Sequence, residues 1–86
     1  LEELGDGAVE SRLARVVLRI GREVGLPDAR GLFLPLRLTR GDLSDLVGCR
    51  VETTIRVMTR WRRAGLVDTL REGLVIRDQA ALRAVA

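Results

Sequence analysis

The amino-acid sequence, 86 residues long, predicts one small α+β domain. Three observations predict this class. Apolar residues recur at helical spacing between residues 9 and 24 and again between residues 43 and 64. Alternation over residues 32–38, and two apolar runs around a polar turn within residues 66–77, predict strands. The balance of 47% hydrophobic to 31% charged residues is typical of a folded chain rather than a disordered one.

The first predicted helix begins at Val9 and is ended by Gly25 and Pro27. Its apolar residues lie at i, i+3, i+4, i+7 and i+11 and therefore share one face: Leu13, Val16, Val17, Ile20 and Val24. Residues 1–7 are acidic and contain two glycines, which predicts the end of a preceding element followed by a linker. We therefore expect the domain itself to span residues 8–86.

A loop is predicted at residues 27–31 and a strand at residues 32–38. The strand is predicted from three leucines that alternate with other side chains: Leu34, Leu36 and Leu38. Pro35 has no backbone N–H to donate to a neighbouring strand, so we expect this strand to lie at an edge of the sheet.

Two helices separated by a short turn are predicted next. Thr39 is the expected N-cap of the first, with Asp42 in the reciprocal position of a capping box. This helix ends at Gly48 and directs three apolar residues inward: Leu43, Leu46 and Val47. The second helix spans residues 51–64, and its inward stripe at i, i+3, i+4 and i+7 consists of Thr54, Val57, Met58 and Trp61.

The turn between these helices fits a helix-turn-helix pattern, in which the second helix is basic. Gly48 can adopt the positive φ that a sharp turn requires, and Ser44 is small enough for a close approach of the two helices. Cys49 follows as a small turn residue, a structural position rather than that of a redox sensor. The alternative is an ordinary helical hairpin.

A β-hairpin is predicted within residues 66–77, with its polar turn at residues 71–73. Asp78 is the expected N-cap of a short terminal helix that carries Leu82 and Val85. The predicted order is therefore helix, edge strand, two-helix helix-turn-helix, hairpin wing and short C-terminal helix.

The charge is unevenly distributed, although the net charge is only +3. All fifteen cations are arginine, and residues 50–63 carry five of them against one glutamate, a net +4, whereas residues 1–10 carry four carboxylates and no cation. A basic segment of helix length predicts contact with a polyanion such as nucleic acid. The alternative is a solvated helix face.

Several classes of function are disfavoured by what the composition lacks. The chain has no histidine and one cysteine, which excludes a zinc finger, an intrachain disulfide and histidine acid–base catalysis. The carboxylates are scattered over predicted surfaces, so we expect no enzyme. No run of 18 apolar residues and no leader-like segment occur, which favours a cytoplasmic protein without a membrane contact.

The outward face of the helix at residues 51–64 carries the candidate base-reading residues. Arg56 can donate two hydrogen bonds to a guanine, and Glu52 can accept from the amino group of a cytosine. Their alternative is an i,i+4 surface ion pair. Val51 and Ile55 suit thymine methyl groups, or otherwise packing against another domain.

Other polar residues near this helix, at the start of the helix before it and at the hairpin tip are predicted to contact phosphates. They are Thr39, Arg40, Arg50, Thr53, Thr59, Arg60, Arg63 and Arg71.

The segment LTRGDLSDLVGCRVETTIRV, residues 38–57, resembles the DNA-binding helix-turn-helix of the Crp/Fnr family of bacterial transcription regulators. The shared pattern is a threonine-led short helix, a Val-Gly pair, a turn and then ETxxR; the likeness extends over about residues 8–86. It implies a winged-helix domain that binds DNA as the output domain of an effector-responsive homodimer. The family's dimerisation helix would end at residues 1–4. No cofactor is implied for this fragment, and the effector of an N-terminal domain is left open.

By the same resemblance, Glu52 and Arg56 match the family's base-reading pair, which implies a palindromic site with a TGA-like half-site core. Val51 agrees with the Fnr-like branch, whereas Ile55 replaces the serine of that branch, so the flanking base preference is left open. Residues 27–31 correspond to a region that contacts RNA polymerase in some relatives. The alternative function is a winged-helix module for protein–protein interaction.

Overall fold

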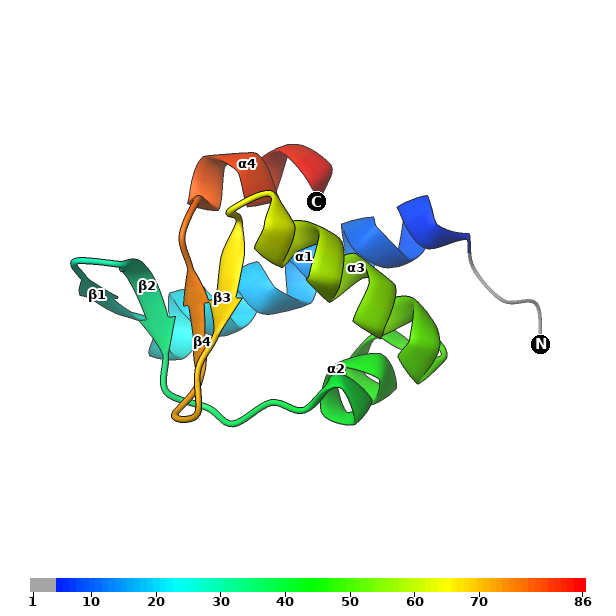
Figure 1. Cartoon of the computed structure of the whole chain (residues 1–86), viewed down its shortest axis with the longest axis horizontal. Helices are drawn as coiled ribbons and strands as arrows, with labels where there is room; N and C mark the ends of the chain where they lie inside the picture. The colour runs from blue at the N-terminus through cyan, green and yellow to red at the C-terminus, as the bar shows by residue number, and fades with distance from the viewer. Residues whose placement is uncertain (1–4) are drawn as a thin grey trace.

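Four helices and a four-stranded antiparallel sheet make up the part of the chain that the computed structural model describes, residues 5–86 (Figure 1). The elements are α1 (Asp6–Val24), β1 (Leu26–Asp28), β2 (Gly31–Leu34), α2 (Arg40–Val47), α3 (Val51–Arg63), β3 (Val67–Thr69), β4 (Leu74–Ile76) and α4 (Gln79–Val85). No helix among the described residues is long and apolar enough to cross a membrane.

Helix α1 begins earlier than predicted, at Asp6 with Gly5 as its N-cap, and so includes part of the segment expected to be a linker. The expected dimerisation-helix end at residues 1–4 lies outside the described residues. Gly21 lies on the buried face of α1, where a Cβ atom would come within 2.9 Å of a methyl group of Leu32. The glycine that weakens the helix therefore allows α1 to approach β2 closely.

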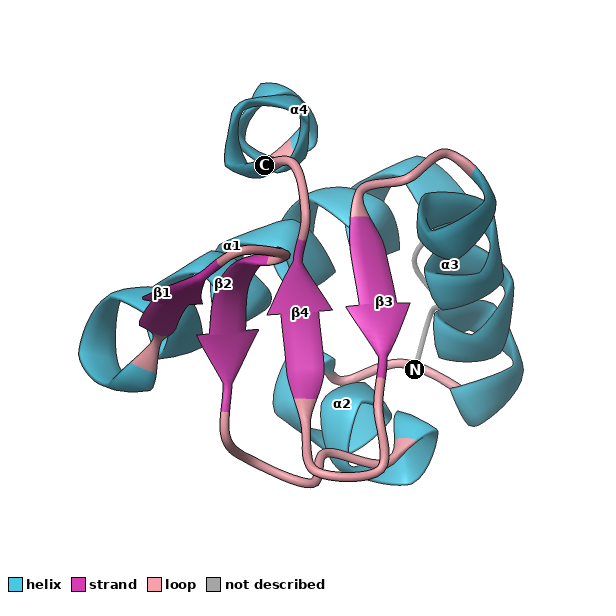
Figure 2. Ribbon diagram, turned by 60° about the vertical axis from the view of Figure 1, so that its left-hand side comes forward, coloured by secondary structure: helices cyan, strands magenta, loops and turns pink. Residues whose placement is uncertain are grey.

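The sheet has the order β1-β2-β4-β3 (Figure 2). Three predictions about this region are wrong. The segment expected to be a loop contains two of the three residues of β1, which pairs with β2 through a tight turn. In addition, β2 ends at Leu34 rather than at residue 38. β2 also lies between β1 and β4 rather than at an edge. Pro35 follows the last strand residue, so its missing N–H removes no ladder bond; the chain then leaves the sheet, and Leu36 is exposed.

Helix α2 begins as predicted, with a complete capping box: the amide of Asp42 donates to Thr39 Oγ1 at 3.0 Å, and the amide of Thr39 donates to Asp42 at 2.9 Å. One inward residue was predicted wrongly, because Leu46 is 57% exposed. Ser44 lies inward, as expected for a close approach of the helices, and its buried hydroxyl is satisfied by donating to the carbonyl of Gly41 at 2.8 Å. This small residue allows α2 to approach the neighbouring helices.

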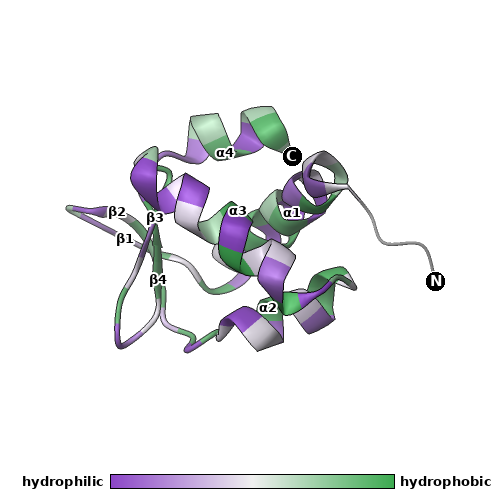
Figure 3. Cartoon of the chain, turned by 45° about the vertical axis from the view of Figure 1, so that its right-hand side comes forward, coloured by the Kyte–Doolittle hydropathy of each residue, from purple (hydrophilic) through white to green (hydrophobic). Residues whose placement is uncertain are grey.

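The core forms where α1, α3 and the sheet meet, and it contains the predicted inward stripe of α3. Trp61, the one tryptophan, is 1% exposed, and its indole N–H donates to Glu10 of α1 at 2.8 Å. The hydropathy of the residues alternates along α3, as expected for a helix with one buried face (Figure 3). The hairpin β3–β4 and the Asp78 cap of α4 are also confirmed.

Candidate nucleic-acid interface

The angle between α2 and α3 is fixed by the turn around Gly48. Gly48 has φ 81° and ψ 47°, a left-handed conformation that favours glycine, and its amide donates to the carbonyl of Ser44 at 2.8 Å. The backbone amide of Cys49 also donates a hydrogen bond to this carbonyl, at 3.1 Å. The sulfur of Cys49 lies 3.2 Å from the hydroxyl of Thr54. The half-buried thiol is therefore part of the turn, as predicted.

Helix α3 is anchored by its inward stripe, which leaves its opposite face to solvent. Val51 and Ile55 are 36% and 45% exposed, and Glu52 and Arg56 are exposed as well. The predicted outward orientation of all four residues is confirmed, while base reading by them stays a prediction. Exposed β-branched apolar residues gain nothing from water, so this end of α3 presents an apolar surface beside one carboxylate and one guanidinium.

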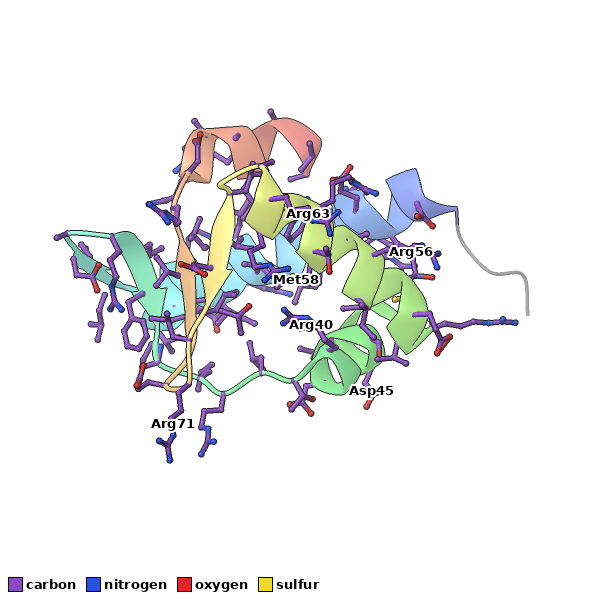
Figure 4. The ribbon with its side chains drawn as sticks, in the orientation of Figure 1. Arg40, Asp45, Arg56, Met58, Arg63 and Arg71 are labelled. Carbon is purple, nitrogen blue, oxygen red and sulfur yellow. The ribbon has the colours of Figure 1, made fainter. Side chains whose placement is uncertain are left out.

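The alternative i,i+4 ion pair between Glu52 and Arg56 is not found among the described residues. The guanidinium of Arg56, labelled in Figure 4, instead donates to the carboxylate of Asp6. The Nη2–Oδ1 and Nε–Oδ2 distances are 3.0 and 3.2 Å. The hydrogen bonds from Arg56 lower the pKa of Asp6, against a smaller opposing effect of desolvation, and the charges of Arg56 and Arg60 lower it further. The Arg56 side chain remains 57% exposed, so it is held at the surface rather than enclosed.

The first turns of α1 make a second contact with α3. Glu10 accepts the indole hydrogen bond from Trp61 and lies 3.5 Å from the guanidinium of Arg60. Sequence reasoning missed Asp6 and Glu10 as residues of this site. The only signal in the sequence was that residues 1–10 are acidic whereas residues 50–63 are basic. This difference in charge carries no information on the distance between the two segments.

The residues predicted to contact phosphates differ in their exposure. Thr53 was predicted wrongly, because it is 2% exposed and its hydroxyl accepts from Arg56 at 3.3 Å. At the helix spacing of 100° per residue, it lies toward the buried stripe rather than outward. The arginines of this set on α3 and at the hairpin tip are exposed, with Arg71 at the tip of the wing (Figure 4): Arg50, Arg60, Arg63 and Arg71. Thr39 is exposed and Thr59 is half-buried.

Arg40 connects the start of α2 to the wing. Its Nη2 donates to the hydroxyl of Thr69 on β3 at 3.1 Å, and the side chain is half-buried. Burial lowers the pKa of Arg40, and the nearby positive charge of Arg62 lowers it further. The positive charges of Arg40 and Arg62 both favour an anion at this position.

A shallow open depression of about 610 Å³ follows the outer face of α3. It is lined by Ile55, Arg56, Thr59, Arg60, Arg63 and Ala64. Three arginines around two small or apolar side chains favour a ligand with both anionic and apolar groups. Among the described residues, no cluster of histidine, cysteine and carboxylate side chains could hold a metal ion.

One family model matches most of this chain. The model of the Crp-like helix-turn-helix domain matches residues 11–85. The chain belongs to this family. The predicted Crp/Fnr-like α+β fold is thereby confirmed.

Relatives of this Crp-like domain include two regulatory proteins. It is 29% identical to Electron transport regulator A of Shewanella oneidensis over 77 residues. These 77 residues are 90% of this chain and 31% of that protein. It has the same identity and coverage with the Fumarate and nitrate reduction regulatory protein of Salmonella typhimurium. The chain therefore spans about a third of the length of these relatives. Both are named as regulators rather than as enzymes.

Two solved structures share the fold of the Crp-like domain. TTHB099, a CRP-family transcriptional regulator of Thermus thermophilus, has a TM-score of 0.79 at 24% identity, over 91% of this chain and 40% of that chain. FixK2 of Bradyrhizobium japonicum has a TM-score of 0.74 at 22% identity, over 90% and 37% of the two chains. At these identities the similarity concerns the fold.

Proposed function

We propose that this Crp-like domain binds double-stranded DNA in a sequence-specific manner and thereby regulates transcription, with α3 in the major groove. The observation that supports this most directly is the face of α3 that presents Val51, Glu52, Ile55 and Arg56 to solvent. The major groove is about 12 Å wide and admits an α-helix. Membership of a helix-turn-helix family and the names of the relatives support the same function.

Arg56 and Glu52 are the proposed readers of base edges. The Arg56 fork can donate to O6 and N7 of a guanine, and Glu52 can accept from N4 of a cytosine. Val51 and Ile55, one turn apart beside Glu52, supply the apolar surface for thymine methyl groups. Because Arg56 already donates to Asp6, it must exchange that carboxylate for the base when DNA binds.

Phosphate contacts are assigned to the ends of this surface. Arg40, with the N-terminus of α2 beside it, and Arg71 at the wing tip would contact the backbone on one side of the groove. Arg50 and Arg63, at the two ends of α3, would contact it on the other. These contacts would set the position of α3 and supply most of the affinity that does not depend on sequence.

The proposed biological unit is a homodimer on a palindromic site with a TGA-like half-site core. A two-fold symmetric protein would place two copies of α3 in successive major grooves, about 34 Å apart. The same proposal includes three further points. The full-length regulator would sense an effector, residues 27–31 would contact RNA polymerase, and the protein would be cytoplasmic.

The salt dependence of binding tests this function. We expect the 86-residue chain to bind a fluorescent duplex that carries a TGA-core palindrome more tightly than a scrambled duplex. If about four phosphates are neutralised per domain, log K should fall with log salt concentration with a slope of roughly −3.6. A flat salt response, or equal affinity for both duplexes, would contradict sequence-specific DNA binding. If the chain bound an acidic protein and random-sequence DNA did not compete with that binding, a protein–protein interaction module would be favoured instead.

A further inference from the structure

A second basic surface lies on α1, on the side that faces away from α3. Its four arginines follow one another at spacings of three, four and three residues: Arg12, Arg15, Arg19 and Arg22. At 100° per residue they fall within a sector of about 80°. The residues of α1 that face α3 and the core, such as Asp6 and Leu13, lie on nearly the opposite side of the helix. A duplex bound by α3 would therefore not reach these arginines.

Helix α4 completes this surface, which we call the arginine face: Arg12, Arg15, Arg19, Arg22 and Arg83. Between its side chains lies a depression of about 580 Å³, lined by Arg15, Val16, Leu18, Arg19, Arg22, Arg83 and Ala86. The depression thus has guanidinium groups from two helices and an apolar part formed by Val16, Leu18 and Ala86. Arg83 also donates to the side-chain oxygen of Gln79 at 3.1 Å.

The arginine face lacks internal neutralisation among the described residues. The ion pairs found in residues 5–86 involve Arg30, Arg56, Arg60 and Arg77, and none of the five arginines of this face. Glu23, one turn after Arg19, borders the face and is not paired with it. Like charges at i,i+3 and i,i+4 repel, whereas solvated helix faces usually alternate the two signs. An external anion would remove this repulsion.

We propose that the arginine face binds an acidic, amphipathic segment of a protein. Carboxylates fit the planar fork of arginine with two hydrogen bonds each, and the apolar part of the depression can hold aliphatic side chains between them. A phosphate backbone offers the charge but not the aliphatic side chains, which is why a polypeptide is favoured over nucleic acid. This inference stands independently of DNA binding by α3, because the two surfaces share no residue.

Fluorescence anisotropy with a labelled amphipathic helical peptide that carries Glu on one face and Leu on the other tests this inference. The triple variant R15Q/R19Q/R22Q should weaken binding of the peptide by at least about tenfold. The matched control R60Q/R62Q/R63Q removes the same charge from α3 and should change it by less than about twofold. A peptide with Gln in place of Glu should not bind. Because all six arginines are exposed, both variants should remain folded, which urea unfolding checks.

Three results would overturn the inference. Equal weakening by both triple variants would reduce it to a non-specific effect of net charge. Equal binding of the Glu and Gln peptides would remove the role of the carboxylates. The third result concerns a random-sequence duplex. If it displaces the peptide from the control variant, but not from R15Q/R19Q/R22Q, the arginine face binds nucleic acid instead.

Discussion

Arg56 of α3 donates two hydrogen bonds, at 3.0 and 3.2 Å, to the carboxylate of Asp6 in the first turn of α1. The two residues are fifty positions apart in the chain, and the tertiary packing of α1 on α3 brings them together. The side chain proposed to read a base is thus already oriented by an acid that competes with the base.

Replacing the competing acid should strengthen DNA binding. In D6N the amide holds Arg56 more weakly and carries no charge, so affinity for the preferred duplex should rise by roughly two- to fivefold. The gain should disappear when D6N is combined with R56A, which a double-mutant cycle of dissociation constants measures. An equal gain in both backgrounds would show that Asp6 acts only through general repulsion of DNA. If the unaltered chain binds DNA and R56A weakens binding but D6N changes nothing, competition is contradicted while DNA reading stands.

The same pair predicts a pH dependence. Because Arg56 lowers the pKa of Asp6 below its ordinary value of 3.8, the ion pair contributes stability that is fully present above that value and is lost as the pH falls through the lowered pKa. R56A should move the pKa of Asp6 back up toward 3.8, as measured by NMR titration of its side-chain carboxyl carbon. Asp28, whose pKa is lowered mainly by the side chain of Arg30, is the internal control and should not move.

Arg56 should govern specificity, whereas Arg71 should govern general affinity. R56A should cost about 1–3 kcal/mol on the preferred duplex and much less on a duplex changed at the base that it reads. R71A should weaken binding to both duplexes alike and lower the salt slope by about one. Binding titrations on the two duplexes at several salt concentrations measure both effects. Uniform losses for R56A would mean that it contacts a phosphate.

Glu10 should stabilise the domain through Trp61. E10A removes the acceptor of a buried indole N–H, which costs about 1–3 kcal/mol of unfolding free energy. E10Q keeps an oxygen acceptor at this position and should cost less. Urea unfolding followed by the fluorescence of the single tryptophan reports directly on this site. Equal losses for the two variants would show that the charge interaction with Arg60, and not the indole bond, matters.

The turn glycine should be required for its backbone conformation alone. A Cβ at Gly48 would meet no atom within 4 Å, but φ is 81°, which other residues adopt only with strain. G48A should therefore destabilise the domain by about 1 kcal/mol or more. The control G7A introduces the same methyl group within α1, also with no atom nearby, and should be neutral or slightly stabilising. Thermal unfolding of the two variants separates strain from crowding.

The sequence predicted those features whose cause lies within one element. The Thr39–Asp42 capping box, the left-handed glycine and the inward stripe of α3 each depend on residues a few positions apart. Strand β1 escaped prediction because three residues, all exposed, show no hydrophobic pattern, and only pairing with β2 makes them a strand. Leu46 was misplaced because the inward direction of α2 depends on which helices pack against it.

For this protein, the sequence by itself determined the family pattern, the two helices of the helix-turn-helix and the face of α3 that turns to solvent. Periodicity and local hydrogen bonds are properties of neighbouring residues, so they can be inferred without coordinates. Only the tertiary structure decided that Asp6 holds Arg56, that Glu10 satisfies Trp61 and that Thr53 is covered. Those contacts join residues that the chain brings together only after α1 and α3 have buried their apolar faces against each other.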